Sequence, residues 1–297
     1  MGAMMVGGVT LGAWLDAAFA SFDYGVFSFL GSLHTDILTF IARLFTSMGS
    51  TIFVVLFAVM GLVMCFFRRT RKVGLAIVFA VAIGTLITNI IVKPMALRIR
   101  PYNTLQGDAD YWSWYISAGM YTESDYCFPS GHTTGATEIA VALCLCLAGS
   151  KKKWTRFVGI AAPIVAFFVG VSRVYLMVHY ATDVLAGWIV GIIAGFAGWG
   201  ISCLVYKLFR KHDEAKPAAS AKIQHAGSAV IIIAWFVMVL ISFLQLTSSG
   251  GAEAIRCAYD REYNCQNEAR VDDKKYPPID GEYYCKIHWK QLTDEQN

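Results

Sequence analysis

Long apolar runs joined by short charged connections restrict the fold of this 297-residue chain more than any other feature of its sequence. A helix needs about 20 predominantly apolar residues to cross the hydrocarbon core of a bilayer. The runs are continuous and do not alternate with polar residues, which argues against membrane-spanning strands. We expect an all-α, polytopic transmembrane helical bundle with about six spans, at residues 51–67, 73–92, 132–149, 157–178, 184–206 and 228–246.

The composition fits a chain that is solvated largely by lipid. Hydrophobic residues make up 56% of the sequence and charged residues 15%, whereas about 25% of the residues of a typical soluble domain are charged. This balance excludes an ordinary soluble domain. The net charge of +4 is small. We expect the bilayer itself to be a partner and expect no nucleic-acid partner, and the oligomeric state is left open.

The charges of the connections predict the orientation of the spans. Roughly half of the 25 basic residues fall in three connections, around residues 68–72, 151–156 and 207–222. The positive-inside rule places these segments in the cytoplasm. The segment 102–131 contains no Lys or Arg and is rich in Tyr and Trp, which suits the opposite, outer membrane boundary. The sequence therefore predicts an integral membrane protein in which the segment 102–131 is an outer loop.

Five regions are expected along the chain. Residues 1–50 form an amphipathic N-terminal interfacial segment, because residues 10–48 are apolar but interrupted by charges. One or two helices on the outer interface are expected there, and a seventh span is the alternative. The other regions are the membrane core 51–206, the basic cytoplasmic linker 207–227, the additional transmembrane helix 228–247 and the extracytoplasmic polar tail 248–297.

Three polar clusters lie at membrane boundaries on the outer side. They are Lys93-x6-Arg100-Pro101, Pro129-Ser130-Gly131-His132 and Ser172-Arg173-x5-His179-x3-Asp183. Charged groups at such depths are costly and usually functional. The clusters are separated in the sequence, but the expected topology brings them to one face, which predicts a single site.

The cations and the start of the third span predict a phosphate-binding site. Lys93, Arg100 and Arg173 bring three positive charges to one surface, without an equal set of acidic partners in the motifs. Guanidinium groups bind phosphate oxygens in pairs, and Lys adds a point charge. Ser130 can cap the helix that begins near Gly131, and the free N–H groups of a helix start attract an anion.

Two histidines supply the reactive groups. If His179 and Asp183 lie on one helix, the carboxylate can orient the imidazole, since residues four apart share a face. His132 lies beside the expected anion site as a proton donor. One histidine can attack phosphorus while the other protonates the leaving oxygen. The sequence contains no cluster of carboxylates that would indicate a metal site.

These motifs resemble the type 2 phosphatidic acid phosphatase (PAP2) family, whose pattern is K-x6-RP, PSGH and SR-x5-H-x3-D. Every fixed position of the pattern is present, in order, within roughly residues 50–205. The resemblance implies a helical core related to that of vanadium-dependent haloperoxidases, and activity without metal or cofactor. It implies that His179 is the nucleophile, Asp183 its orienting partner and His132 the general acid. The implied phosphate ligands are Lys93, Arg100, Ser130, Gly131 and Arg173.

The implied function is metal-independent hydrolysis of a membrane lipid phosphate or diphosphate at the outer face. We favour a polyprenyl diphosphate such as undecaprenyl diphosphate. Phosphatidylglycerol phosphate and phosphatidic acid are close competitors. A bacterial plasma membrane, with the active site outside the cytoplasm, is the expected location. A non-catalytic protein that binds or transports an anionic lipid is the alternative, but it would leave both histidines without a role.

Several other residues have a structural interpretation and a functional one. We expect Glu138 to be a buried, hydrogen-bonded structural group, with a proton shuttle as the alternative. Gly187, Gly191 and Gly195 recur every four residues and predict close helix packing, with a dimer interface as the alternative. In the tail, disulfides, a zinc site including His288 and free thiols are all open for Cys257, Cys265 and Cys285, and a disulfide with Cys127 is considered.

Overall fold

The structure is a computed structural model, and it describes residues 4–123, 125–214, 254–256 and 268–270. Its described part is mostly helical. The helices are α1 (Leu11–Gly31), α2 (Asp36–Ser47), α3 (Thr51–Cys65), α4 (Arg71–Thr85), the π-helix η1 (Leu86–Val92), α5 (Lys93–Ala96), α6 (Pro101–Thr104), α7 (Ala109–Ala118), α8 (Gly131–Leu147), α9 (Lys153–Tyr175) and α10 (Ala181–Glu214). Two short antiparallel pairs accompany them, β1 (Met5–Val6) with β2 (Val9–Thr10) and β3 (Ala254–Arg256) with β4 (Glu268–Arg270).

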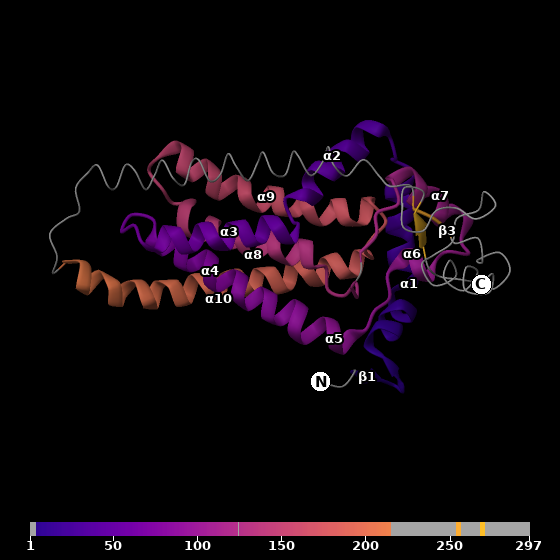
Figure 1. Cartoon of the computed structure of the whole chain (residues 1–297), viewed down its shortest axis with the longest axis horizontal. Helices are drawn as coiled ribbons and strands as arrows, with labels where there is room; N and C mark the ends of the chain where they lie inside the picture. The colour runs from indigo at the N-terminus through magenta and orange to yellow at the C-terminus, as the bar shows by residue number, and fades with distance from the viewer. Residues whose placement is uncertain (1–3, 124, 215–253, 257–267, 271–297) are drawn as a thin grey trace, which may run out of the picture.

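Five long helices form a bundle whose axes follow the long axis of the molecule. Helix α10 packs along both α4 and α8, α8 packs on α9, and α3 packs on α4. Figure 1 shows α1, α6 and α7 gathered at one end of this bundle, while the connections α3–α4 and α8–α9 lie at the other end. The basic connections therefore lie at the end of the bundle opposite to α1, α6 and α7, as the charges of the connections predicted.

Three described helical stretches are long and apolar enough to cross a membrane, namely Arg71–Thr104, Lys153–Tyr175 and Ala181–Leu208. The pair α2 and α3 passes the same test together but is bent by 40°, which gives a fourth candidate. Helix α8 is apolar but has only 17 residues. The all-α membrane bundle is confirmed. The described residues support three or four spans by length and composition, whereas the sequence predicted five in this part.

Close packing of α8 against α10 depends on three glycines of α10. A methyl group on Gly191 would lie 2.5 Å from Cβ of Thr137, and one on Gly195 would lie 2.5 Å from Cβ of Val141. Gly187 faces the first turn of α8 in the same way. The glycines therefore pack inside the bundle, as predicted, and they hold the start of α8 against the start of α10.

The N-terminal segment forms two helices, in agreement with the expected one or two. Thr10 caps α1 and Thr35 caps α2, each through a side-chain oxygen that accepts from the N–H three residues on. Helix α1 lies across the end of the bundle and contacts α5, α7, α9 and α10 (Figure 1). Its position in the membrane interface stays a prediction.

Two boundaries differ from the sequence prediction. The second expected run ends in a π-helix, η1, and π-helical turns are frequent at functional sites. Helix α10 continues to Glu214, so the first residues of the expected linker 207–227 are helical. The expected span 228–246 and the tail cysteines lie outside the described residues. Cys127 is described, and it is a buried free thiol rather than half of a disulfide.

Candidate active site

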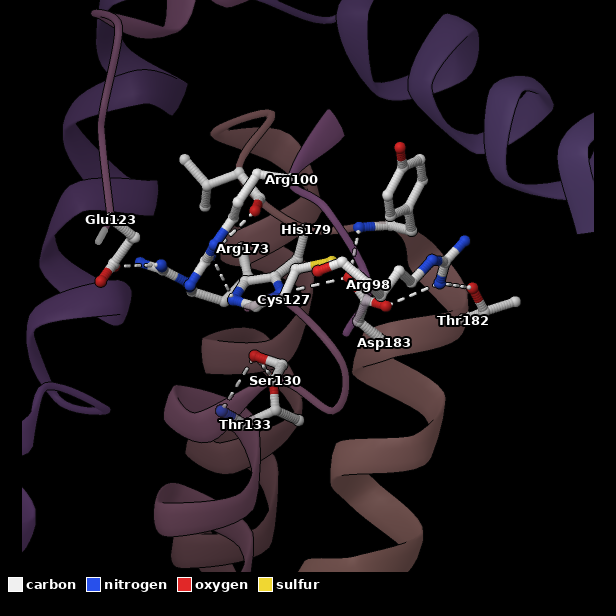
Figure 2. Close-up of polar contacts among 12 residues, drawn as sticks. Arg98, Arg100, Glu123, Cys127, Ser130, Thr133, Arg173, His179, Thr182 and Asp183 are labelled. Atoms are coloured by element: carbon white, nitrogen blue, oxygen red, sulfur yellow. Dashed lines mark hydrogen bonds and ion pairs between the residues drawn. The ribbon is translucent and has the colours of Figure 1, made fainter. Parts of the chain in front are cut away.

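The fold brings the three motif clusters to one end of the bundle. The first cluster follows η1, the second opens α8, and the third connects α9 with α10. Lys93, Arg100, Gly131, His132 and His179 line one cavity of about 390 Å³. Ser130, Arg173 and Asp183 are buried close to it (Figure 2). The prediction that these residues lie together agrees with this geometry, while their chemical roles stay predictions.

The start of α8 is fixed against α10. The side chain of Ser130 caps α8, where its Oγ accepts from the Thr133 hydroxyl at 3.0 Å. The backbone N–H of Ser130 donates to the carbonyl of Asp183 at 3.1 Å. This hydrogen bond ties the helix start to the residue that holds His179. The free N–H groups of the first turn of α8 therefore lie beside His179.

His179 is held between a carboxylate and a guanidinium. Its Nδ1 lies 3.2 Å from Asp183 Oδ2, and its Nε2 lies 2.9 Å from Arg100 Nη1. Arginine can only donate hydrogen bonds, so Nε2 must be the acceptor. The ring proton is then on Nδ1, where it donates to Asp183. The sequence expected this pair on one helix, but His179 precedes α10, and only Asp183 lies in its first turn.

The environment of His179 favours the neutral imidazole. Burial lowers the pKa of His179 well below its usual value, and Arg100, Arg173 and Lys93 lower it further. A neutral ring with its proton on Nδ1 presents the Nε2 lone pair toward the cation cluster. Asp183 Oδ2 also accepts from the Tyr180 N–H at 3.0 Å, which fixes the carboxylate. The arrangement suits a nucleophilic nitrogen.

Two acids outside the motifs neutralise the cations, and the sequence analysis missed both. Asp125 accepts from Arg100 Nη2 at 2.5 Å and also forms an ion pair with Lys93. Glu123 accepts from Arg173 Nη2 at 2.5 Å. The sequence offered a signal for these acids, since the three boundary cations lacked acidic partners in the motifs. An incoming phosphate would compete with these two carboxylates for the same donors.

The carboxyl groups of this loop are held ionised. Burial raises the pKa of Glu123, but Arg173 and Arg100 outweigh burial, and the net pKa is lowered. For Asp125, burial likewise raises the pKa, and Lys93 and Arg100 reverse the effect and lower it. Both side chains are therefore anionic at neutral pH.

Arg98 is a third residue that the sequence analysis missed. It is fully buried, and its guanidinium donates to Asp183 Oδ1 at 2.6 Å, to Asp23 at 2.8 Å and to Asp16 at 2.8 Å. The guanidinium also stacks 3.9 Å from the ring centre of Tyr180. Asp16 and Asp23 are seven residues apart on one face of α1, a spacing that could have suggested a buried partner.

The donor set favours an anion over a metal ion. Within the residues that the structure describes, no group of three or more His, Cys, Asp and Glu side chains could hold a metal. The cavity instead gathers Lys93, Arg100, His132 and His179. A helical membrane bundle with such a cationic, histidine-containing site fits the class of membrane proteins that act on phosphorylated molecules.

Comparisons with known proteins identify the family. The model of the PAP2 superfamily matches residues 73–210. Phosphatidylglycerophosphatase B of Bacillus subtilis is 32% identical over 155 residues, which cover 51% of this chain and 68% of that protein. The chain therefore belongs to the PAP2 superfamily, and the resemblance noted in the sequence is confirmed.

Two further relatives are similar in sequence or structure. The undecaprenyl-diphosphatase of Sulfolobus acidocaldarius is 35% identical over 125 residues, which cover 42% of this chain. This match spans about half, 53%, of the archaeal protein. The crystal structure of a transmembrane PAP2-type phosphatidylglycerolphosphate phosphatase from Bacillus subtilis superposes with a TM-score of 0.51 at 28% identity, covering 64% of this chain and 90% of that chain.

Proposed function

We propose that this PAP2 protein is a phosphatase that hydrolyses a membrane lipid phosphate or diphosphate through a phosphohistidine intermediate. The observation that carries the proposal is the geometry of His179. Its Nδ1 is held by Asp183, and its Nε2 lies 2.9 Å from Arg100, at the edge of a cavity that also contains His132 and Lys93. A positioned nucleophile and positive charges are what phosphoryl transfer requires.

In the first step, Nε2 of His179 attacks phosphorus and the bond to the leaving oxygen breaks. Lys93, Arg100 and Arg173, with the N–H groups at the start of α8, stabilise the charge on the equatorial oxygens. His132 donates a proton to the leaving oxygen, and the lipid departs as an alcohol from a monophosphate or as the lipid monophosphate from a diphosphate. Asp183 stabilises the developing positive charge on the imidazole of His179.

In the second step, water attacks the phosphohistidine. His132, which gave up a proton in the first step, accepts the proton of this water as phosphate forms and Nε2 of His179 is released. Ser130 and Gly131 contribute by placing the start of α8 beneath the phosphate. None of these steps requires a metal or an organic cofactor, so the proposal includes activity in the presence of a chelator.

A lipid substrate fits the shape of the cavity. From the cationic end, the cavity extends between α3, α4 and α8 along an apolar wall formed by Val54, Val55, Ala58, Val59, Leu62 and Val81. A phosphate can therefore bind at the polar end while a hydrocarbon chain lies against this wall. The substrate would enter sideways from the bilayer, near the aromatic-rich segment 102–131.

Three lipid classes are considered. The sequence favoured a polyprenyl diphosphate, with phosphatidylglycerol phosphate and phosphatidic acid as competitors. The named relatives act on both a prenyl diphosphate and phosphatidylglycerophosphate, which supports a lipid phosphate but not one lipid over the other. The distribution of basic residues supports an active site at the extracytoplasmic face, and the proposed membrane is a bacterial plasma membrane.

Phosphate release by the purified protein tests the proposal. The protein would be assayed in detergent micelles with excess EDTA against all three lipid classes, with His179→Ala beside the wild type. We expect release by the wild type and a loss of at least about a thousandfold in the variant, because a nucleophile is removed. With ³²P-labelled lipid, the wild type should trap label that is stable to alkali and labile to acid.

The same experiment separates the enzyme from a lipid-binding or transport protein. A folded wild type that binds the lipids but releases no phosphate from any of them would refute the enzyme and favour the alternative. Release that EDTA abolishes would refute the metal-independent mechanism alone.

A further inference from the structure

The cavity of the active site reaches a second polar group deep in the bundle. Glu138 lines the same cavity as His132 and Lys93. It lies seven residues after Gly131 on α8, and a rise of 1.5 Å per residue places it about 10 Å along the helix from its start. The proposed chemistry at the helix start makes no use of it.

The carboxyl group of Glu138 has no partner among the described residues. The side chain is 1% exposed, and its Oε2 makes no hydrogen bond. Gly84 of α4 makes room for it, because a methyl group at Gly84 would overlap Oε2. The sequence interpretation of Glu138 as a hydrogen-bonded structural group is therefore wrong for this oxygen.

An unpaired carboxyl at this depth calls for a ligand. A buried polar group without a hydrogen bond costs free energy, and an ionised carboxylate without a counter-ion costs much more. Glu138 therefore offers the cavity a neutral carboxyl, which can donate one hydrogen bond and accept others. Thr85 and Thr88 also line this cavity, and Asn89 lines it close to Lys93 at the cationic end.

We propose that Glu138 marks a second, hydrogen-bonding subsite for the linker of a glycerolipid phosphate, where the carboxyl binds an ester carbonyl or a hydroxyl of the lipid. The inference rests on the proposed function, since it places the phosphate of the same molecule at the cationic end. A polyprenyl diphosphate has only hydrocarbon at this distance from phosphorus, so it would leave the carboxyl unpaired. Glu138 is thus a specificity-determining residue that favours glycerolipids, in contrast to the lipid that the sequence favoured.

The selectivity of turnover tests the inference. We would compare kcat/KM for phosphatidylglycerol phosphate with kcat/KM for undecaprenyl diphosphate in the wild type, Glu138→Leu and Glu138→Gln. The ratio should fall about tenfold in Glu138→Leu, which corresponds to the loss of one buried hydrogen bond. Glu138→Gln should keep most of the ratio, because an amide also donates and accepts.

Thr137→Val provides the matched control. Thr137 is the neighbour of Glu138 on α8, and its hydroxyl is also buried without a hydrogen-bond partner in the described part of the chain. Its side chain faces Gly191 of α10 and does not line the cavity. Its replacement should leave the ratio of the two lipids as in the wild type. An equal loss on both lipids in Glu138→Leu, or no change in the ratio, would overturn the inference.

Binding without turnover keeps this test separate from the proposed function. In a His179→Ala background, phosphatidylglycerol phosphate should raise Tm, and adding Glu138→Leu should remove most of that increase. If the wild type releases no phosphate but this stabilisation depends on Glu138, the proposed function fails and the subsite stands. If the wild type is active and phosphatidylglycerol phosphate raises Tm equally with and without Glu138→Leu, the subsite is refuted and the proposed function stands.

Discussion

The protonation of His179 links the local structure to the pH dependence of activity. Burial and the neighbouring cations Arg100, Arg173 and Lys93 lower the pKa of His179. The proposed nucleophile is therefore neutral down to a pH below the usual histidine value of about 6.5. We expect the acid limb of the kcat/KM profile to have its midpoint below pH 6.5, since this profile reports the free enzyme.

The variant Arg100→Gln tests whether the neighbouring cations lower the pKa of His179. Arg100→Gln removes one cation beside His179, so the pKa of the imidazole should rise and the acid limb should move to higher pH, although the maximal rate falls. The measurement is kcat/KM from about pH 4.5 to 8. An acid limb at or above pH 6.5 in the wild type would contradict the argument.

Asp125 occupies the cations that the proposed mechanism assigns to phosphate. Its pKa is lowered, because Lys93 and Arg100 outweigh the effect of burial, so it competes as an anion at neutral pH. Asp125→Asn should therefore strengthen competitive inhibition by inorganic phosphate, by about two- to fivefold for a half-exposed ion pair. The inhibition constant in wild type and variant gives the answer.

A matched control is available in the same outer segment. Asp110 is an exposed acid of α7 and makes no ion pair with Lys93 or Arg100. Asp110→Asn removes the same charge and should leave the inhibition constant within error of the wild type. If both variants strengthen inhibition equally, general electrostatics and not competition at the cations is responsible.

At the scale of elements, Arg98 joins α1 to the end of the bundle that holds the proposed site. It donates to Asp16 and Asp23 on α1 and to Asp183 on α10, all within 2.8 Å. Arg98→Met leaves buried carboxylates without their cation, a change that typically costs about 3–5 kcal/mol. We expect a lower Tm, and a lower kcat as well, because Asp183 loses a contact that positions it.

A second substitution distinguishes an unpaired charge from lost packing. Asp23→Asn in the Arg98→Met background removes one of the stranded carboxylates and should recover part of the Tm. Thermal unfolding in detergent measures both changes. If the double variant is less stable than Arg98→Met, the loss arises from packing rather than from charge.

The sequence predicted which residues form the site better than it predicted which side chains pair with them. Lys93, Arg100, His132 and His179 were placed at one boundary by the apolar runs and the charge pattern, and the structure puts them on one cavity. Their partners could not be predicted in this way. The spacing of Asp16 and Asp23 on α1 indicates that a partner exists but not which residue it is, since Asp23 and Arg98 meet only because α1 lies across the end of the bundle.

At the scale of the whole molecule, the two ends of the bundle predict its orientation in the membrane. The proposed site, α1 and α7 lie at one end, and the basic connections α3–α4 and α8–α9 lie at the other (Figure 1). Since basic connections stay in the cytoplasm, the end with the site should face outward. A lipid phosphate of the outer leaflet could then reach it without crossing the bilayer.

Cysteine labelling in intact bacterial cells measures this orientation directly. In a cysteine-free background, Ser117→Cys on α7 should react with a membrane-impermeant maleimide, because this exposed position lies at the outer end. Lys152→Cys, exposed beside α9 at the basic end, should react only after the cells are permeabilised. The reverse pattern would place the site at the cytoplasmic face and would restrict the substrate to lipids of the inner leaflet.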